Sequence, residues 1–400
     1  MKVDVSKAFD TVSVDGLVQA LRRSQAREWL QLALARESVL AATRFVDPAS
    51  GVPGEPVTAR RGVRQGGPES ADLFRHVLDL ALSNVDHMFS TRWAEEGWFS
   101  GIMRAVVLYA DDITLFAPSM REGQLLMDGV IEALATVGLS VSPPKSEWLP
   151  VLLPEGEDPA AGLLIAGVRV PPSQAVTLLG SRIDVEDCPA AAAEFRAMKA
   201  WKAFYALGCV LQSSGVSRSV KCRVMSARIL PVLVWGSENW VYHHATARYT
   251  DGVFMQMLQK CLPSSQLPGE ARWQWRIRSI RVARQTYEQL GFILPAERWL
   301  KNLWGYAGHI GRRSADNERA TLTERLTLYR EYHDWCSQKH WVHGRSGFHA
   351  RWDSPLFQFV NCMHVGEELV SWTQLTHCRE DWAAWKKHLA QHYKPVRNDQ

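Results

Sequence analysis

The sequence predicts an α+β fold for the front of the chain and an all-α fold for the remainder. Up to Pro189, strand-like and helix-like apolar patterns alternate, and the strongest hairpin signal flanks Asp111 and Asp112. Beyond Pro189 the strand signals fade, and helical spacing continues close to the C-terminus. The 400 residues, of which 46% are hydrophobic and 22% charged, indicate two or three folded domains and exclude wholesale disorder.

The front elements follow from apolar spacing and from Pro and Gly breaks. We expect a strand at 2–5, helices at 14–22 and 28–43, a loop at 46–56, a strand at 57–63 and a helix at 70–89. A hairpin at 105–110 and 113–117 follows, then a helix at 122–137 ended by Gly138, and strands near 148–153, 163–170 and 175–179. Helices laid over a largely antiparallel sheet make this an α+β domain.

The back half shows helical spacing at 190–211, 216–234 and 247–262. A linker rich in Pro, Ser and Gly at 263–269 precedes a third helical segment, which is rich in Trp, Arg and His. We therefore expect three regions, at residues 1–188, 189–262 and 270–400.

The net charge of +4 conceals an asymmetry along the chain. Residues 1–190 contain 17 Lys and Arg against 25 Asp and Glu, whereas residues 191–400 contain 29 against 17. Of the 17 tryptophans, 13 lie beyond residue 190. An acidic front and a basic, aromatic-rich back suggest a chemistry-bearing domain joined to one that binds a polyanion, although Trp and Arg also build ordinary helical domains.

Composition also limits the location of the chain. No stretch approaches the roughly 18 uninterrupted apolar residues that a membrane-spanning helix needs, and the first thirty residues lack a secretory h-region. The seven cysteines include no CxxC pair, which is typical of reduced thiols. We therefore expect a soluble intracellular chain with no membrane contact.

Three acids lie at unexpected places in the apolar pattern. Asp4 lies within an apolar strand, and Asp111 and Asp112 lie between two strands that are expected to be buried. Like charges near a core repel and cost desolvation unless a cation joins them. Hard divalent cations such as Mg²⁺ bind carboxylate oxygens and keep positions for a phosphate substrate. The alternative interpretation is a structural turn, because Asp is common in tight turns.

Five segments, taken in order, resemble the motifs of reverse transcriptases. Residues 3–10 (VDVSKAFD) resemble motif A, 62–70 (GVRQGGPES) motif B and 109–112 (YADD) motif C, while 138–147 are similar to motif D and 178–180 to the primer-grip motif E. The KAFD and RQG segments are typical of non-LTR (LINE-type) retrotransposon polymerases. Residues 230–240 and 304–312 resemble the thumb-region sequences of the same elements, so the resemblance spans most of the chain.

The resemblance implies a right-hand polymerase palm at 1–188 with the fingers largely missing, a helical thumb at 189–262 and a basic helical region at 270–400. It also implies two-metal nucleotidyl transfer. Two Mg²⁺ ions, with Mn²⁺ as an alternative, would be held by Asp4, Asp111 and the backbone carbonyl of Val5, with Asp112 in a supporting role.

The substrate contacts come from the same resemblance. Phe9 matches the steric gate that would reject ribonucleotides, or it packs in the core against the following helix. Gln65, Gly66 and Gly67 would let backbone approach the nucleotide. Lys145 matches the motif D lysine, a candidate general acid for pyrophosphate, although residues 142–144 depart from the family pattern. The expected template and primer contacts are Arg64, Leu179 and Gly180.

Two further clusters have weaker signals. A basic and aromatic group suited to phosphate contact and base stacking comprises Trp273, Trp275, Arg276, Arg278, Arg281 and Arg284. A Cys and His group fits no standard zinc spacing, so polar residues on helical faces are the default interpretation. That group comprises Cys336, His340, His343 and His349.

The function predicted is an RNA-directed DNA polymerase of a non-LTR retrotransposon, with an RNA template, a DNA primer or target and dNTPs. The expected location is the nucleus, with a cytoplasmic ribonucleoprotein as the alternative. The competing function is a truncated, non-catalytic relic that binds RNA or DNA; a group II intron-type maturase is a third reading. Because Met1 lies three residues before Asp4, we expect RNA binding through 191–400 but poor primer extension.

Overall fold

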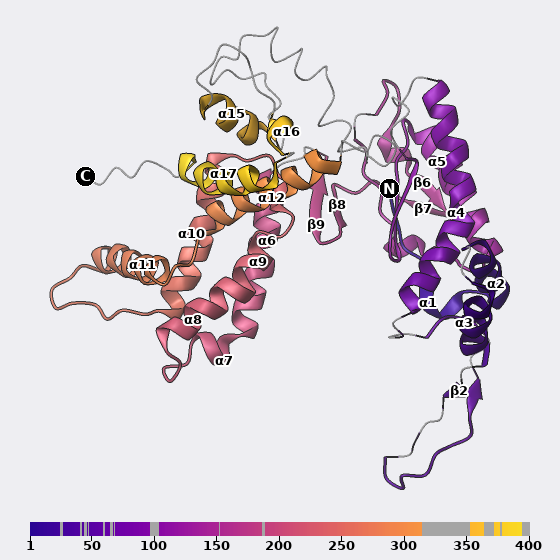
Figure 1. Cartoon of the computed structure of the whole chain (residues 1–400), viewed down its shortest axis with the longest axis horizontal. Helices are drawn as coiled ribbons and strands as arrows, with labels where there is room; N and C mark the ends of the chain where they lie inside the picture. The colour runs from indigo at the N-terminus through magenta and orange to yellow at the C-terminus, as the bar shows by residue number, and fades with distance from the viewer. Residues whose placement is uncertain are drawn as a thin grey trace. The chain divides into compact units, whose positions relative to one another are not determined.

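A computed structural model divides the chain into two compact units, Met1–Leu178 and Leu179–Gln400 (Figure 1). The described residues are 1–24, 27–40, 42–43, 46, 48–58, 61–64, 67, 69–96, 104–151, 153–185, 189–313, 353–363, 372–376 and 378–393. The division falls in the turn that follows the predicted motif E strand. The predicted boundaries at 188 and 262 stay predictions.

The first unit mixes short strands with helices. Its elements are β1 (Lys2–Val3), α1 (Ala8–Thr11), α2 (Val14–Arg23), α3 (Glu28–Leu40), β2 (Ala42–Thr43), β3 (Val57–Thr58), α4 (Ser70–Glu95), β4 (Val106–Tyr109), β5 (Asp112–Leu115), α5 (Met120–Thr136), η1 (Pro143–Lys145), η2 (Pro159–Ala161), β6 (Leu163–Ile165), β7 (Val168–Val170) and β8 (Ala175–Leu178). The α+β class is therefore confirmed for this unit.

A three-stranded antiparallel sheet lies at the centre of the first unit, in the order β1-β5-β4. Val3 and Ile113 are paired across β1 and β5, and both are fully buried. Helices α4 and α5 contact the sheet, and they contribute buried residues such as Phe74 and Leu126 to the same core. Removal of this apolar surface from water, worth about 25 cal/mol per Å², fixes the strands against the helices.

Side-chain caps set the starts of two core helices. The Ser13 hydroxyl accepts a hydrogen bond from the Gly16 N–H at the start of α2, and Ser119 accepts one from Glu122 at the start of α5. Each cap satisfies an N–H that has no partner within its helix. At the end of α5, Gly138 has a φ of +78°, and a Cβ there would lie 3.1 Å from Ser13 Cβ. The end of α5 therefore packs directly against the cap of α2.

The structure differs from the predicted elements at three places in the first unit. The expected strand at 163–170 is a hairpin of β6 and β7, in which Ala166 and Gly167 have φ values of 47° and 79°. Such paired positive φ angles are typical of two-residue hairpin turns, and Gly167 was the available signal. Residues 42–43, expected at the end of a helix, form β2 and pair with β3. Around 148–153, no strand lies among the described residues.

The second unit is almost entirely helical, as the sequence predicts. Its elements are β9 (Ser181–Asp184), α6 (Pro189–Ala206), α7 (Gly208–Leu211), α8 (Arg218–Val224), η3 (Met225–Ile229), α9 (Leu230–Leu233), η4 (Ser237–Asn239), α10 (His244–Cys261), α11 (Arg272–Gln289), α12 (Pro295–Arg313), α15 (Ser354–Met363), α16 (Trp372–Leu375) and α17 (Arg379–His392). None of the described helices is long and apolar enough to span a membrane.

A proline interrupts the helix that was expected at 216–234. The chain follows an α-helical path in α8, widens into a π-type turn in η3 and resumes as α9, with Pro231 in the first turn of α9. Proline lacks an N–H and its ring clashes with the carbonyl four residues earlier. A π-type turn accommodates both effects, because it shifts the hydrogen-bonding register.

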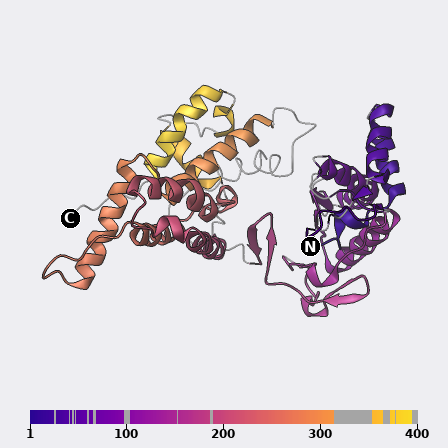
Figure 2. The same cartoon turned by 90° about the horizontal axis from the view of Figure 1, so that it is seen from below.

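Two tryptophans join α12 to α17. The rings of Trp304 and Trp382 are stacked with centroids 3.7 Å apart, and each indole N–H donates to the other residue's carbonyl, at 2.6 Å and 3.1 Å. Figures 1 and 2 show the two helices, orange and yellow, packed along each other. A Cβ at Gly308 would overlap the Trp382 indole, so glycine is required for this close approach. The two helices therefore form one rigid pair.

Candidate active site

The register of the central sheet brings the motif A and motif C acids to the same end. Val3 pairs with Ile113, so one residue further along the antiparallel pair Asp4 faces Asp112. Tyr109 pairs with Asp112 across the hairpin, which leaves Ala110 and Asp111 as a two-residue turn. Asp4 and the Asp111-Asp112 turn thus lie side by side, although 107 positions separate Asp4 from Asp111 in the sequence.

The hairpin turn holds Asp111 at the surface. Ala110 has a φ of 53°, a conformation that two-residue hairpin turns use and that non-glycine residues adopt at a cost. Asp111 is exposed at the tip, and Tyr109 before it is 65% exposed. The turn therefore presents its carboxylate to solvent, where a substrate could reach it.

The segment that carries motif D contacts both the backbone and the carboxylate of Asp4. The Asp4 N–H donates to the Ser146 hydroxyl at 3.1 Å, and the Ser142 N–H donates to the Asp4 carbonyl at 2.8 Å. The Asp4 Oδ2 atom is buried and has no hydrogen-bond partner. Lys145 Nζ lies 4.0 Å from that oxygen. Despite the prolines at 143 and 144, the motif D lysine reaches the motif A acid.

Sequence reasoning did not single out Lys2 and Ser146 as members of this site. Lys2 Nζ lies 3.7 Å from Asp112 Oδ1 and donates to the Thr177 carbonyl at 3.1 Å. Ser146 also donates from its hydroxyl to the Ser142 carbonyl at 2.9 Å. The available signal for Lys2 was its position two residues before Asp4, on the same face of the strand.

The motif B loop is described only in part. Gln65 and Gly66 lie outside the described residues. Arg64 has an exposed side chain, and its carbonyl accepts hydrogen bonds from the Gly67 N–H at 3.3 Å and from the Ser70 hydroxyl. A Cβ at Gly67 would lie 2.6 Å from the Ser70 hydroxyl oxygen, so the turn before α4 requires glycine there. The backbone turn is thereby fixed to the start of α4.

Phe9 lies between the core and the surface. Its side chain is half-buried, and its ring is stacked on Phe74 with centroids 4.8 Å apart. Its carbonyl accepts a hydrogen bond from the Val63 N–H at 2.7 Å, which ties motif A to motif B. The ring packs on α4 rather than on α2, the helix that follows Phe9, and both the packing role and the role as a nucleotide gate stay predictions.

The motif E turn is strained and held by two side chains of the second unit. Leu179 and Gly180 have φ values of 47° and 82°. The Trp235 indole N–H donates to the Leu179 carbonyl at 2.9 Å, and Arg196 donates to the Gly180 carbonyl at 3.1 Å and to the Val232 carbonyl at 2.8 Å. Burial lowers the pKa of the Arg196 guanidinium. These bonds offset the cost of placing a leucine in the left-handed region.

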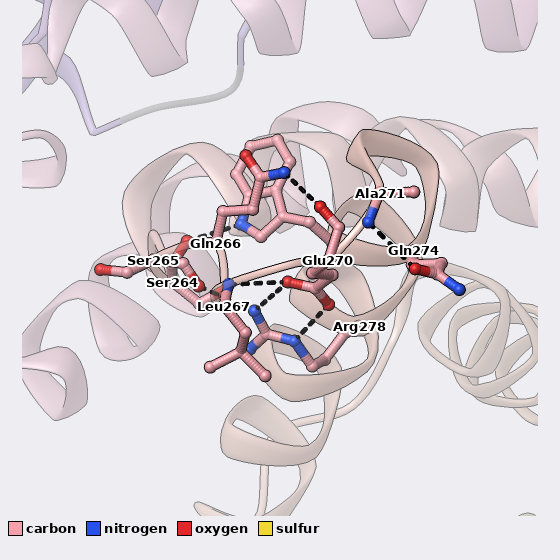
Figure 3. A network of polar contacts seen from close by, with 9 residues as sticks. Ser264, Ser265, Gln266, Leu267, Glu270, Ala271, Gln274 and Arg278 are labelled. Atoms are coloured by element: carbon pink, nitrogen blue, oxygen red, sulfur yellow. Dashed lines mark hydrogen bonds and ion pairs between the residues drawn. The ribbon is translucent and has the colours of Figure 1, made fainter.

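The basic and aromatic cluster on α11 divides into a structural half and an exposed half. Arg278 binds both oxygens of Glu270 at 2.8 Å, and the hydrogen bonds and ion pair with Arg278 lower the pKa of Glu270 to about 2 (Figure 3). Arg278 also donates to the Ser265 carbonyl, and Trp275 donates to the Ser264 carbonyl, so the predicted linker is closed onto α11. Arg284 pairs with Glu288. The exposed members are Trp273, Arg276 and Arg281.

Metal ligands were predicted at two places. The Cys and His group at Cys336, His340, His343 and His349 lies outside the described residues. Within the described ranges, no group of three or more His, Cys, Asp or Glu residues could hold a metal ion. The Oδ2 atom of Asp4 is buried, accepts no hydrogen bond and lies 4.0 Å from the Lys145 ammonium, so this oxygen, beside Asp111 and Asp112, fits a cation that is completed by substrate oxygens.

Comparison with known families assigns the front of the chain. Residues 1–183 match the family described as reverse transcriptase (RNA-dependent DNA polymerase). This range contains all five motifs and ends just after the motif E turn. The front part of the chain is therefore similar to reverse transcriptases over the range that carries the motifs.

Two individual proteins are similar to the chain in sequence. The chain is 24% identical over 277 residues to a transposon-derived protein of Caenorhabditis elegans, and this match covers 69% of the chain and 92% of that protein. It is 28% identical over 166 residues to a Pol polyprotein of retrotransposable element R2 from Nasonia vitripennis, covering 39% of the chain but 14% of the polyprotein. Residues of the chain are thus similar to transposon-derived proteins, among them a polyprotein of an R2 retrotransposable element.

Among solved structures, the chain is similar to a telomerase from Candida albicans in complex with a fragment of telomeric RNA. The match covers 85% of the chain and 51% of that protein, with 13% sequence identity and a TM-score of 0.33. This likeness is too low to carry an argument about the fold.

Proposed function

We propose that the chain is an RNA-directed DNA polymerase that adds deoxynucleotides to a primer 3′-hydroxyl on an RNA template. The observation that carries the proposal is the register of β1, β5 and β4, which brings Asp4 beside the Asp111-Asp112 turn. The similarity of residues 1–183 to the reverse transcriptase family supports the same chemistry.

In this proposal Asp4, Asp111 and the Val5 carbonyl bind two Mg²⁺ ions, or Mn²⁺ in their place, and Asp112 supports them. The ions, when bound, stabilise the negative charge that develops on the transferred phosphoryl group. The Oδ2 atom of Asp4 supports this assignment, because it is buried and accepts no hydrogen bond, and its contact with the Lys145 ammonium is a long one of 4.0 Å that a metal ion could replace. Lys2 would hold Asp112 in place through their ion pair.

Lys145 has a separate role in the proposal, as proton donor to the leaving pyrophosphate from its Nζ atom. Its ammonium lies 4.0 Å from Asp4 Oδ2 and its side chain is 72% exposed, so it can turn from the carboxylate toward a substrate. Positioned general acids contribute about 10²–10⁴-fold to rate. The Ser146 and Ser142 hydrogen bonds keep the motif D segment against Asp4.

The nucleotide and the primer would be bound around these acids. Phe9, Gly67 and the loop residues Gln65 and Gly66 would contact the incoming nucleotide, and Arg64 would contact a phosphate. The strained turn of Leu179 and Gly180 would contact the primer strand, since its geometry is fixed by Trp235 and Arg196. The expected site of action is the nucleus.

Primer extension on an RNA template tests the proposal. The full chain should incorporate dNTPs in the presence of Mg²⁺ and stop when the metal is chelated. Asp4→Asn should abolish extension, while Asp79→Asn, an exposed acid on α4, should leave it unchanged. Extension that survives Asp4→Asn would contradict the assignment. RNA binding without any extension by the unaltered chain would favour the binding-only alternative.

The role of Lys145 needs its own readout. Lys145→Gln should lower kcat for extension by about 10²-fold or more, because the proton donor is gone. Lys145→Arg keeps the charge and should retain the KM for the nucleotide while its kcat also falls. An unaltered kcat in Lys145→Gln would show that the lysine only pairs with Asp4.

A further inference from the structure

Two pockets on the second unit join along helices α12 and α17. One, of about 500 Å³, is lined by residues that include Trp235, Arg298, Lys301 and Lys386; the other, of about 610 Å³, includes His309, Arg312, Arg379 and Lys386. Both are lined by Gly305 and Lys386. We call the joined surface the α12–α17 groove.

Helical spacing explains why cations gather there. On α12, Arg298, Lys301, Gly305, His309 and Arg312 are separated by three or four residues, so they lie on one face of the helix. On α17 the residues Arg379 and Lys386 are seven apart and also share a face. The stacked rings of Trp304 and Trp382 hold α12 against α17, so the basic faces of the two helices lie side by side.

The charges in the groove are mostly positive, because one acid, Glu238, lines it against five Lys and Arg residues. Lys301 pairs with Glu297 at 2.8 Å. The other four cations have no carboxylate partner among the described residues, and the Arg298 Nε atom is buried without a hydrogen bond. They are Arg298, Arg312, Arg379 and Lys386. Crowded like charges of this kind are unfavourable unless an anion joins them.

The pKa shifts agree with this crowding. Burial, followed by repulsion from Lys301 and Arg298, lowers the pKa of the Lys386 ammonium. Burial and repulsion from Arg379 lower the pKa of the Arg312 guanidinium. A bound polyanion would reverse the repulsive part of both shifts, because an opposite charge nearby favours the protonated form.

An aromatic side chain completes the chemistry. The Trp235 ring is 54% exposed and lines the groove beside Arg298 and Lys301. Its indole N–H is used by the Leu179 carbonyl, so the ring is held in one orientation. Exposed aromatic rings beside cations are the parts with which proteins stack the bases of a single strand and hold its phosphates. The ring also joins the groove to the motif E turn.

We propose that the α12–α17 groove binds the sugar-phosphate backbone of a single-stranded nucleic acid. Arg298, Lys386, Arg312 and Arg379 contact phosphates, and Trp235 stacks on a base next to the motif E turn. The groove accounts for the 304–312 segment, whose role the active site leaves unexplained. Gly308 in that segment admits Trp382, while Gly305, His309 and Arg312 face the strand. The choice of a nucleic acid as ligand rests on the proposed polymerase function.

The test is binding of a fluorescent 20-nucleotide RNA, and of DNA with the same sequence, to the full chain over a range of salt. The Arg298→Gln/Lys386→Gln variant removes two phosphate contacts. Its dissociation constant should rise about tenfold or more, and the salt slope should fall by about 1.4, or 0.7 for each contact. The control Lys199→Gln/Lys387→Gln removes the same charge from exposed positions on α6 and α17, and its affinity should change less than twofold.

Loss of binding to both RNA and DNA in the groove variant supports backbone recognition; loss for RNA alone restricts the ligand to RNA. Equal losses in the groove and control variants, or no loss in either, would overturn the proposal. If the groove variant does not fold, ultraviolet cross-linking of 4-thiouridine RNA to the unaltered chain replaces it. Cross-links to α12, α17 or Trp235 are then expected, and their absence would overturn the proposal.

The same reagents separate this inference from the polymerase assignment. If the unaltered chain never extends a primer but the groove variant loses binding, the proposed function is refuted and the nucleic-acid binding of the groove is supported. A chain that extends a primer while both variants bind equally well refutes the groove and keeps the function.

Discussion

The two units differ in the sign of their net charge and in their secondary structure. Residues 1–178 contain 16 Lys and Arg against 22 Asp and Glu, and residues 179–400 contain 30 against 20. In the first unit the informative side chains are carboxylates at the end of a small sheet. In the second they are guanidinium and ammonium groups on helix faces, with most of the tryptophans.

The difference in charge indicates that the two units have different roles toward a nucleic acid under the proposed function. An acidic site repels a polyanion unless metal ions are bound, whereas a basic helical surface attracts one directly. We therefore expect the first unit to control the rate of the chemical step and the second to control affinity for the nucleic acid.

The largest effect is expected from the motif C turn. Asp111→Asn should lower primer extension by on the order of 10³-fold, because a neutral amide no longer stabilises a cation at the developing charge. RNA affinity, measured by anisotropy on the same preparation, should stay within twofold. A parallel loss of RNA affinity would break the division between the units.

Phe9 and Phe74 test whether the front unit also selects its substrate. Both truncations remove one ring of the stacked pair and should destabilise the unit, by about 3–5 kcal/mol for the fully buried Phe74→Ala and less for the half-buried Phe9→Ala. Only Phe9→Ala should admit ribonucleotides in primer extension, if Phe9 is the gate. Unchanged discrimination in Phe9→Ala would leave it a packing residue.

Substitutions at two glycines of α12 test the packing of α12 on α17, which forms the α12–α17 groove. Gly308→Ala should lower the free energy of unfolding by about 1–3 kcal/mol, because its Cβ would overlap the Trp382 indole. Gly305→Ala, on the exposed face of the same helix, should raise it by about 0.5–1 kcal/mol through helix propensity. Thermal unfolding of both variants measures this, and equal shifts would contradict the close packing of α12 and α17.

A buried acid in the second unit gives the smallest expected effect. Burial raises the pKa of Asp251 to about 6, although the Ala296 N–H donates to it at 2.9 Å. The folded state therefore binds the proton more tightly than the unfolded one, and stability falls as the pH rises from about 4 to about 6. The decline should be about 2 kcal/mol or less, and Asp251→Asn should remove it. Urea unfolding at pH 4 and pH 6.5 compares the two proteins, and an identical pH slope would contradict the raised pKa.

The sequence predicted that Asp4 and Asp111 lie near one another, whereas it did not predict the α12–α17 groove, for a physical reason. Asp4, Asp111 and Lys145 lie in short motifs, and strand alternation with a two-residue hairpin is enough to bring the two aspartates together. The hairpin turn at Ala166 was missed, because an alanine with positive φ leaves a weak local signal.

The groove could not be predicted from local patterns. Arg298 and Lys386 are 88 positions apart, and only the packing of α12 on α17 brings them to one pocket. Composition favoured the basic and aromatic cluster on α11 as the nucleic-acid contact. Two of its arginines, Arg278 and Arg284, form ion pairs with Glu270 and Glu288 instead. Many Lys and Arg residues in a sequence indicate a polyanionic partner. The packing of the helices decides which of these side chains form ion pairs within the protein and which can contact the partner.

The most direct test of the division is one primer-extension series in which the concentration of RNA template and primer is varied. Asp111→Asn should stay about 10³-fold below the unaltered chain at every concentration. Arg298→Gln/Lys386→Gln should raise the half-saturating concentration about tenfold and reach the same plateau. A groove variant that lowers the plateau without shifting half-saturation, or an Asp111→Asn chain that recovers activity at high template, would contradict the account.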